Sequence, residues 1–89
     1  MEISEILYFE AEWCESCRNM KPKFKEVCRD RGFTNYRFID TDNADSCDLI
    51  DFYKVRQLPT LVFKSDDGDW KSHSGSDGFE IAAGLLDKV

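Results

Sequence analysis

An apolar run followed closely by a helical pattern is the feature that most restricts the fold of this chain. Residues 6–9 read ILYF, and so short and apolar a run is typical of a strand covered on both faces of a sheet. Residues 15–31 then show helical spacing, with Met20 and Phe24 on one face. Gly32 follows, and glycine accepts the left-handed conformation that ends many helices. The pattern predicts a buried strand that leads into an amphipathic helix.

The rest of the chain continues this alternation of strands and helices. Residues 35–40 alternate as a second strand, and 49–53 have the apolar content of a short helix. Residues 60–64 form a third strand, and a DDG turn leads into a fourth near Trp70. Asp77 can cap a last helix. The first two strands should be parallel, joined by a right-handed crossover, and the last two an antiparallel hairpin. We therefore expect an α/β fold of order β-α-β-α-β-β-α, with a central four-stranded mixed sheet flanked by three helices.

Length and charge limit the classes of protein to consider. The chain has 89 residues, which predicts one domain, and a net charge of −6 at pH 7. Binding to nucleic acid or to anionic membranes requires basic patches, so neither partner is expected. The start, MEISEILYF, has no basic residue before its apolar run, unlike a secretory signal, and no stretch approaches the roughly 20 apolar residues of a membrane span. We expect a cytoplasmic monomer.

Residues 13–17 read WCESC and place two thiols three positions apart. Cys14 falls where the first strand gives way to the helix, and the free N–H groups and dipole of a helix start favour a negatively charged sulfur. Cys17 follows one turn later, within reach of the first sulfur. Two thiols so placed can close a disulfide or open one, but half of a zinc site and a pair of inert thiols are alternatives.

The remaining cysteines decide between these alternatives. Zinc takes four ligands, often as two close pairs, whereas Cys28 and Cys47 are neither adjacent nor paired and His73 stands alone. In a reducing cytosol, thiols in a small chain are more often catalytic or metal-binding than structural disulfides. Cys28 lies on the apolar helix face and is expected in the core. Cys47 is expected on the same sheet edge as Cys14, as a regulatory thiol or an exposed bystander.

Three segments resemble the thioredoxin family: FEAEWCESC at 9–17, YKVRQLPT at 53–60 and SG at 74–75. The length is nearer that of glutaredoxins, but Trp13 and LPT are more similar to thioredoxins. The resemblance covers almost the whole chain and begins at the family's central strand. It implies that residues 1–89 form a single thioredoxin-like domain that lacks the extra N-terminal strand and helix of full-length thioredoxins.

The resemblance also implies a role for each matching residue. Cys14 matches the attacking cysteine, whose thiolate forms a mixed disulfide with a partner, and Cys17 matches the cysteine that resolves it. Pro59 matches the family's cis-proline, which exposes backbone groups to a substrate chain. Trp13 and Leu58 match positions that line the substrate site. The Cys14–Cys17 disulfide would be the redox group, with no further cofactor.

The function implied is a thiol–disulfide oxidoreductase that reduces protein disulfides by dithiol exchange. A thioredoxin reductase-like flavoprotein or glutathione would supply the electrons. A glutaredoxin-like reductase of glutathione mixed disulfides is one alternative, although the TVP and Gly-Gly segments typical of that site are absent. The other alternative is a non-catalytic module that binds a partner protein through the same surface.

Two departures from the family pattern concern the chemistry of the pair. Glu-Ser stands between the cysteines in place of the common Gly-Pro, and Tyr8 occupies the position of a buried aspartate that accepts the resolving thiol's proton. With a reference pKa near 10, Tyr8 cannot act as a carboxylate base. Water, Glu10 or Glu12 would then take the proton from Cys17. Together with Glu15, these acids disfavour a thiolate and should keep the pair a reductant.

Overall fold

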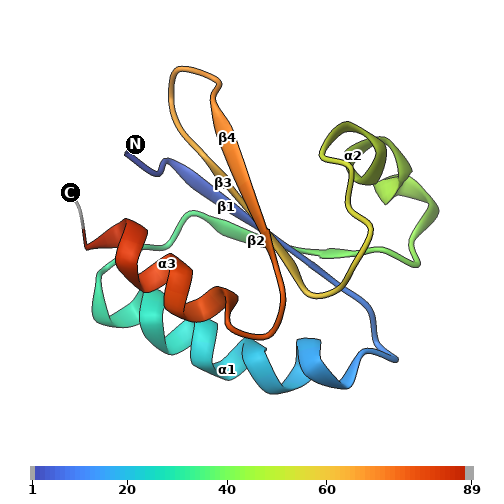
Figure 1. Ribbon diagram of the computed structural model, residues 1–89, viewed down its shortest axis with the longest axis horizontal. Coiled ribbons are helices and arrows are strands. Elements are labelled where there is room, and N and C mark those ends of the chain that lie inside the picture. The colour runs from blue at the N-terminus through green and yellow to red at the C-terminus, as the bar shows by residue number, and fades with distance from the viewer. Residues whose placement is uncertain (1, 88–89) are drawn as a thin grey trace.

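The computed structural model describes residues 2–87, with a β-sheet at its centre and helices on both faces (Figure 1). The strands are β1 (Glu5–Glu10), β2 (Tyr36–Asp40), β3 (Thr60–Lys64) and β4 (Trp70–Ser74). The helices are α1 (Glu15–Asp30), the short 3₁₀ helix η1 (Ala44–Ser46), α2 (Cys47–Phe52) and α3 (Gly78–Leu86). The predicted order of strands and α-helices is confirmed, and η1 is an addition to it.

The sheet is mixed, with the strand order β2-β1-β3-β4. β1 runs parallel to β2 and antiparallel to β3, and β3 and β4 form the antiparallel hairpin. Tyr8, in the middle of β1, lies opposite Phe38 on one side and Leu61 on the other. Because parallel strands end at the same edge, the loops after β1 and β2 emerge side by side. These are the loops that lead to α1 and, through η1, to α2.

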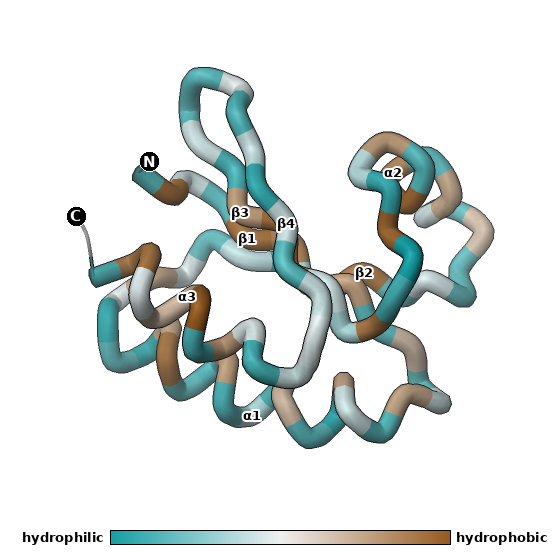
Figure 2. Tube along the Cα trace, in the orientation of Figure 1, coloured by the Kyte–Doolittle hydropathy of each residue, from teal (hydrophilic) through white to brown (hydrophobic). Residues whose placement is uncertain are grey.

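The alternation of β1 divides the core into two layers. Ile6 and Tyr8 face α1 and α3, whereas Leu7 and Phe9 face α2. Figure 2 shows the hydrophobic stretches of β1 and β3 at the centre of the sheet and a hydrophilic tip on the β3–β4 hairpin. The layer under α1 and α3 also contains Met20, Phe24, Cys28, Leu61, Phe63, Ala82 and Leu86, and the α2 layer also contains Ile39, Tyr53, Val55 and Val62.

Helix α1 follows from its sequence at both ends. Its buried face repeats at the predicted helical spacing, from Cys17 through Met20, Phe24 and Cys28. Gly32 has a φ of 67°, and the N–H of Phe33 donates to the carbonyl of Cys28 at 2.9 Å. This is the Schellman arrangement that ends helices at a glycine, so the predicted end is confirmed.

Asp77 occupies the N-cap position of α3 but does not cap it with its side chain. Its Oδ1 lies 2.7 Å from Nε2 of His73, on β4. The predicted side-chain cap is therefore wrong, because the histidine four residues earlier holds the carboxylate.

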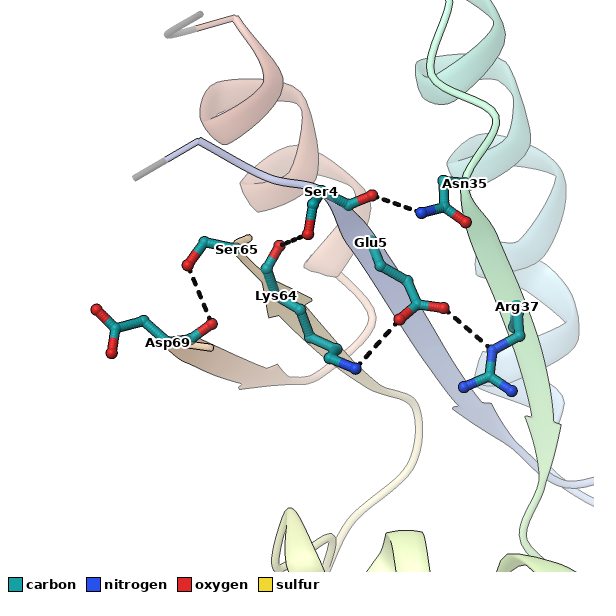
Figure 3. A network of polar contacts seen from close by, with 7 residues as sticks. All are labelled: Ser4, Glu5, Asn35, Arg37, Lys64, Ser65 and Asp69. Carbon is teal, nitrogen blue, oxygen red and sulfur yellow. Dashed lines mark hydrogen bonds and ion pairs between the residues drawn. The ribbon is translucent and has the colours of Figure 1, made fainter. Parts of the chain in front are cut away.

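The N-terminal end of β1 is fastened by a polar network, which Figure 3 shows from close by. The carboxylate of Glu5 accepts hydrogen bonds from Lys64 on β3 and Arg37 on β2, both at 3.2 Å. The network ties three strands together at the end of β1 opposite to Cys14. Along residues 2–87, no helix combines the length and the apolar character needed to cross a bilayer.

Candidate active site

Cys14 and Cys17 form a disulfide at the start of α1, with their Cα atoms 5.3 Å apart. Cys14 is the N-cap residue, with extended backbone (φ −86°, ψ 103°), and its sulfur accepts a hydrogen bond from the N–H of Cys17 at 3.2 Å. The N–H of Cys14 in turn donates to the carbonyl of Ala11 at 3.1 Å. The sulfur of Cys14 therefore lies at the positive end of the α1 dipole, where a thiolate is stabilised.

The two sulfurs differ in accessibility. Cys14 keeps 7% of its surface exposed, whereas Cys17 has none. Both pack with Ala11 in a small apolar cluster, and Leu58 covers this cluster from the segment before β3. Any group that approaches the disulfide from solvent therefore meets Cys14 first.

The segment before β3 has a fixed backbone shape beside this cluster. The Leu58–Pro59 peptide bond is cis, as the resemblance implied. The carbonyl of Pro59 accepts a hydrogen bond from the N–H of Gly75 at 2.9 Å. Gly75 has a φ of 128°, which side-chain-bearing residues rarely adopt, and a Cβ there would lie 3.1 Å from Asp77 Oδ1. The glycine thus lets the loop after β4 reach Pro59.

A groove of about 350 Å³ opens beside Leu58 and Trp13. Trp13 is 68% exposed, so its indole ring is accessible to a molecule that enters the groove. The structure thus brings together two residues that the sequence assigned to a substrate site, from segments 45 positions apart in the chain. The groove is also lined by Thr41, Ile50, Val55, Arg56 and Gln57, which the sequence did not single out.

Tyr8 lies in the core beneath the pair. It is fully buried, and its hydroxyl donates a hydrogen bond to the carbonyl of Cys17 at 2.7 Å. Burial raises the pKa of Tyr8 above its ordinary value, and the negative charge of Glu10 raises it further. The tyrosine therefore stays protonated and supports the first turn of α1.

Two basic side chains of α1 lie beside the acidic loop that precedes Cys14. Lys21 Nζ lies 3.1 Å from the carboxylate of Glu10, and the guanidinium of Arg18 donates to the backbone carbonyl of Glu12. Neither contact was predicted from the sequence, although Arg18 follows Cys14 and Lys21 follows Cys17 at a spacing of four, which places each pair on the same side of α1. The acidic field near the disulfide is thus partly compensated.

The other two cysteines are unpaired and lie in different environments. Cys28 is buried among the core residues under α1, as predicted, and burial raises the pKa of its thiol to about 11. Cys47 is exposed at the first position of α2. Within residues 2–87, no three His, Cys, Asp or Glu residues gather in a cluster that could hold a metal ion.

The sheet order, the disulfide at the start of α1 and the cis-proline before β3 define a protein of the thioredoxin fold class. The crystal structure of Deadhead, a germline-specific thioredoxin of Drosophila melanogaster, matches with a TM-score of 0.78 and 29% identity, over 96% of this chain and 80% of that one. The family model described as Thioredoxin matches residues 2–87. The chain belongs to the thioredoxin family.

Two relatives found by sequence are longer than the part of them that matches this chain. Thioredoxin-1 of Caenorhabditis elegans is 29% identical over 84 residues, which are 94% of this chain and 71% of that protein. Thioredoxin of Mycoplasmoides gallisepticum is 31% identical over 61 residues, or 68% of this chain. The matched part spans only 59% of the Mycoplasmoides protein.

Proposed function

We propose that the chain is a thiol–disulfide oxidoreductase that reduces disulfides in partner proteins. The observation that carries this proposal is the difference between the two sulfurs: Cys14 is at the helix N-cap and reachable, whereas Cys17 is buried one turn behind it. A reachable thiolate attacks, and a protected thiol within bonding distance resolves the product.

The exchange proceeds in two balanced steps. The Cys14 thiolate attacks one sulfur of a partner disulfide, which forms a mixed disulfide and releases the other partner sulfur as a thiolate. Cys17 then loses its proton and attacks the sulfur of Cys14. The Cys14–Cys17 bond forms, the bond to the partner breaks, and the partner leaves with both electrons as a dithiol once protonated.

The groove supports a protein as the substrate. Trp13 and Leu58 offer apolar contact in the groove, and the segment around Pro59 offers backbone groups to an extended chain. We propose a thioredoxin reductase-like flavoprotein or glutathione as the electron donor. A reducing compartment is required, and we propose the cytoplasm, with the chain acting as a monomer.

Insulin reduction tests the proposal. Cys14→Ser should abolish activity, whereas Cys17→Ser should accumulate a mixed disulfide with insulin that a non-reducing gel detects. Equal residual activity in both variants contradicts the proposed roles. Faster reduction of a glutathione mixed disulfide than of insulin would favour the glutaredoxin-like alternative. Full biological activity of the Cys14→Ser/Cys17→Ser double variant would favour a binding module.

A further inference from the structure

The resolving step needs a group that removes the proton of Cys17. A thiol attacks as its thiolate, and the ordinary thiol pKa is about 8.5, so little thiolate forms unaided at neutral pH. Cys17 is fully buried, and the hydroxyl of Tyr8 beneath it is protonated and already donates to the Cys17 carbonyl. Tyr8 therefore cannot accept the proton of Cys17, which leaves water or another side chain near α1.

Burial singles out one carboxylate at this end of the sheet. Among residues 2–87, only Glu5 and Glu10 are partly buried, and every other Asp and Glu is exposed. Glu5 is at the opposite end of β1, held between Lys64 and Arg37 (Figure 3). Glu10 is the last residue of β1, four positions before Cys14.

The strand geometry directs Glu10 toward α1. Side chains two positions apart on a strand share a face, so Glu10 lies on the same side of β1 as Tyr8. Lys21, one helical turn after Cys17, confirms this orientation because its ammonium contacts the Glu10 carboxylate at 3.1 Å.

Lys21 is itself held in place. Its ammonium lies 4.2 Å from the centroid of the Phe38 ring, which packs edge-on against Tyr8 at 5.0 Å. An ammonium fixed on an aromatic face and paired with a carboxylate keeps that carboxylate oriented. Lys21 is thus a positioning residue for Glu10.

A hollow of about 280 Å³ opens beside this pair. Glu10, Lys21 and Ala11 are among the residues that line it. Ala11 also packs directly on Cys14 and Cys17. The hollow is large enough for water, and the charged side chains of Glu10 and Lys21 that line it offer hydrogen-bond partners to that water. Glu12 also lines the hollow but is exposed, and only its backbone carbonyl is held, by Arg18.

We propose that Glu10, oriented by Lys21, accepts the proton of Cys17 in the resolving step. The inference rests on the proposed function. The carboxylate takes the proton as the Cys17 sulfur attacks Cys14, and the electron pair of the broken bond leaves on the partner sulfur. Glu10 then returns the proton to the partner thiolate or to solvent, so atoms and charge balance.

Stopped-flow reaction of the reduced protein with dithionitrobenzoate separates the two steps. Attack by Cys14 releases one coloured thiolate, and resolution by Cys17 releases a second. All variants carry Cys47→Ser, which removes the exposed thiol. Glu10→Gln keeps the size of the side chain. At pH 7 the rate of the first phase should stay within about twofold of the parent protein, and the rate of the second should fall at least about tenfold, which is a modest general-base contribution. The difference in second-phase rate between the variant and the parent protein should shrink above about pH 8.5, where hydroxide in the solvent removes the thiol proton of Cys17 unaided.

Controls separate proton transfer from charge and from folding. Glu12→Gln makes the same charge change nearby and should leave the second phase unchanged. Glu10→Asp keeps a carboxylate and should restore much of the rate. A second phase of wild-type speed in Glu10→Gln, equal slowing of both phases, or equal slowing by Glu12→Gln overturns the assignment. Release of only one coloured thiolate per parent protein would instead contradict the proposed function.

Discussion

The hydroxyl of Tyr8 on β1 donates a hydrogen bond to the backbone carbonyl of Cys17 on α1, 2.7 Å away. The bond joins the central strand to the first turn of the helix that carries the disulfide. At the position where the family pattern has an aspartate, this chain has a tyrosine, and burial raises the pKa of its hydroxyl. The buried tyrosine thus supports the site but leaves the proton chemistry to its neighbours.

Removal of this hydroxyl should destabilise the protein moderately. Tyr8→Phe leaves the Cys17 carbonyl without its side-chain donor, and a buried hydrogen bond contributes about 1 kcal/mol. Urea unfolding of the oxidised protein measures the loss. Tyr36→Phe is the control, because in the described residues its hydroxyl makes no side-chain hydrogen bond, and it should cost less than about 0.5 kcal/mol. Equal losses in the two variants would show that the hydroxyl–carbonyl contact contributes nothing specific.

Two phenylalanines on helices should differ sharply in their contribution to stability. Phe24 is fully buried against Tyr8, Tyr36 and Phe38, so Phe24→Ala should cost about 3–5 kcal/mol. Phe52 is 64% exposed, and Phe52→Ala should cost less than about 1 kcal/mol. Thermal or urea unfolding gives both values. A cost for Phe52→Ala as large as that for Phe24→Ala would be inconsistent with the described packing.

The two unpaired thiols should react at very different rates. In the oxidised protein at pH 8, iodoacetamide should label Cys47 and spare Cys28, because burial raises the pKa of the Cys28 thiol to about 11 and excludes the reagent. Mass spectrometry of digested protein identifies the labelled residue. Addition of denaturant should make Cys28 as reactive as Cys47. Labelling of Cys28 in the folded protein at the rate of Cys47 would refute its burial.

An ion pair between the ends of α1 and α3 should make stability depend on pH in the acid range. Arg31 donates two hydrogen bonds to Asp87, at 2.7 and 3.1 Å, and these bonds lower the pKa of the Asp87 carboxyl. A carboxyl whose pKa is lower in the folded than in the unfolded protein stabilises the folded state at pH values above its unfolded pKa, about 3.9. This contribution is lost as the pH falls through the folded pKa.

Asp87→Asn should therefore be less stable than the wild type at pH 7, and the difference should disappear below about pH 3. Unfolding free energies of both proteins across this range provide the measurement. Glu26→Gln, an exposed change on α1, should show no such convergence. A constant difference between the Asp87 variant and the wild type at all pH values would mean that the ion pair is not its cause.

The potential of the disulfide should lie nearer the value of about −270 mV of thioredoxin than the −120 mV of a strong oxidant. Glu12 lies two positions before Cys14, Glu15 lies between the two cysteines, and both are exposed. Their negative charge disfavours the thiolate of the reduced form. Glu15→Lys should make the potential less negative by on the order of 10–30 mV. Glu26→Lys, farther along α1, is the control and should change it much less. Equilibration with glutathione buffers gives the values, and a wild-type potential above about −180 mV would make an oxidant or isomerase role the better interpretation.

Much of the fold could be predicted because its signals are local. The apolar run at 6–9 became the buried strand β1, and the spacing of Met20 and Phe24 identified the buried face of α1. The side-chain cap of Asp77 could not be predicted, because the partner that takes its carboxylate is His73 on the preceding strand. The spacing of apolar residues and the presence of turn residues are properties of a few consecutive positions. The partner of a side chain depends on how distant segments pack together.

The sequence by itself determined that two cysteines lie where a buried strand ends and a helix begins. The reason is that the apolar spacing of the strand and of the helix can be recognised from consecutive residues. Only the tertiary structure decided which charges surround them. The sequence left water, Glu10 and Glu12 as candidate acceptors for the proton of Cys17. Packing of α1 on β1 directs Glu10 to Lys21, eleven residues away, and leaves Glu12 exposed. The physical reason is that the burial and partner of a charged side chain depend on how a helix lies on a sheet, and no local pattern specifies that contact.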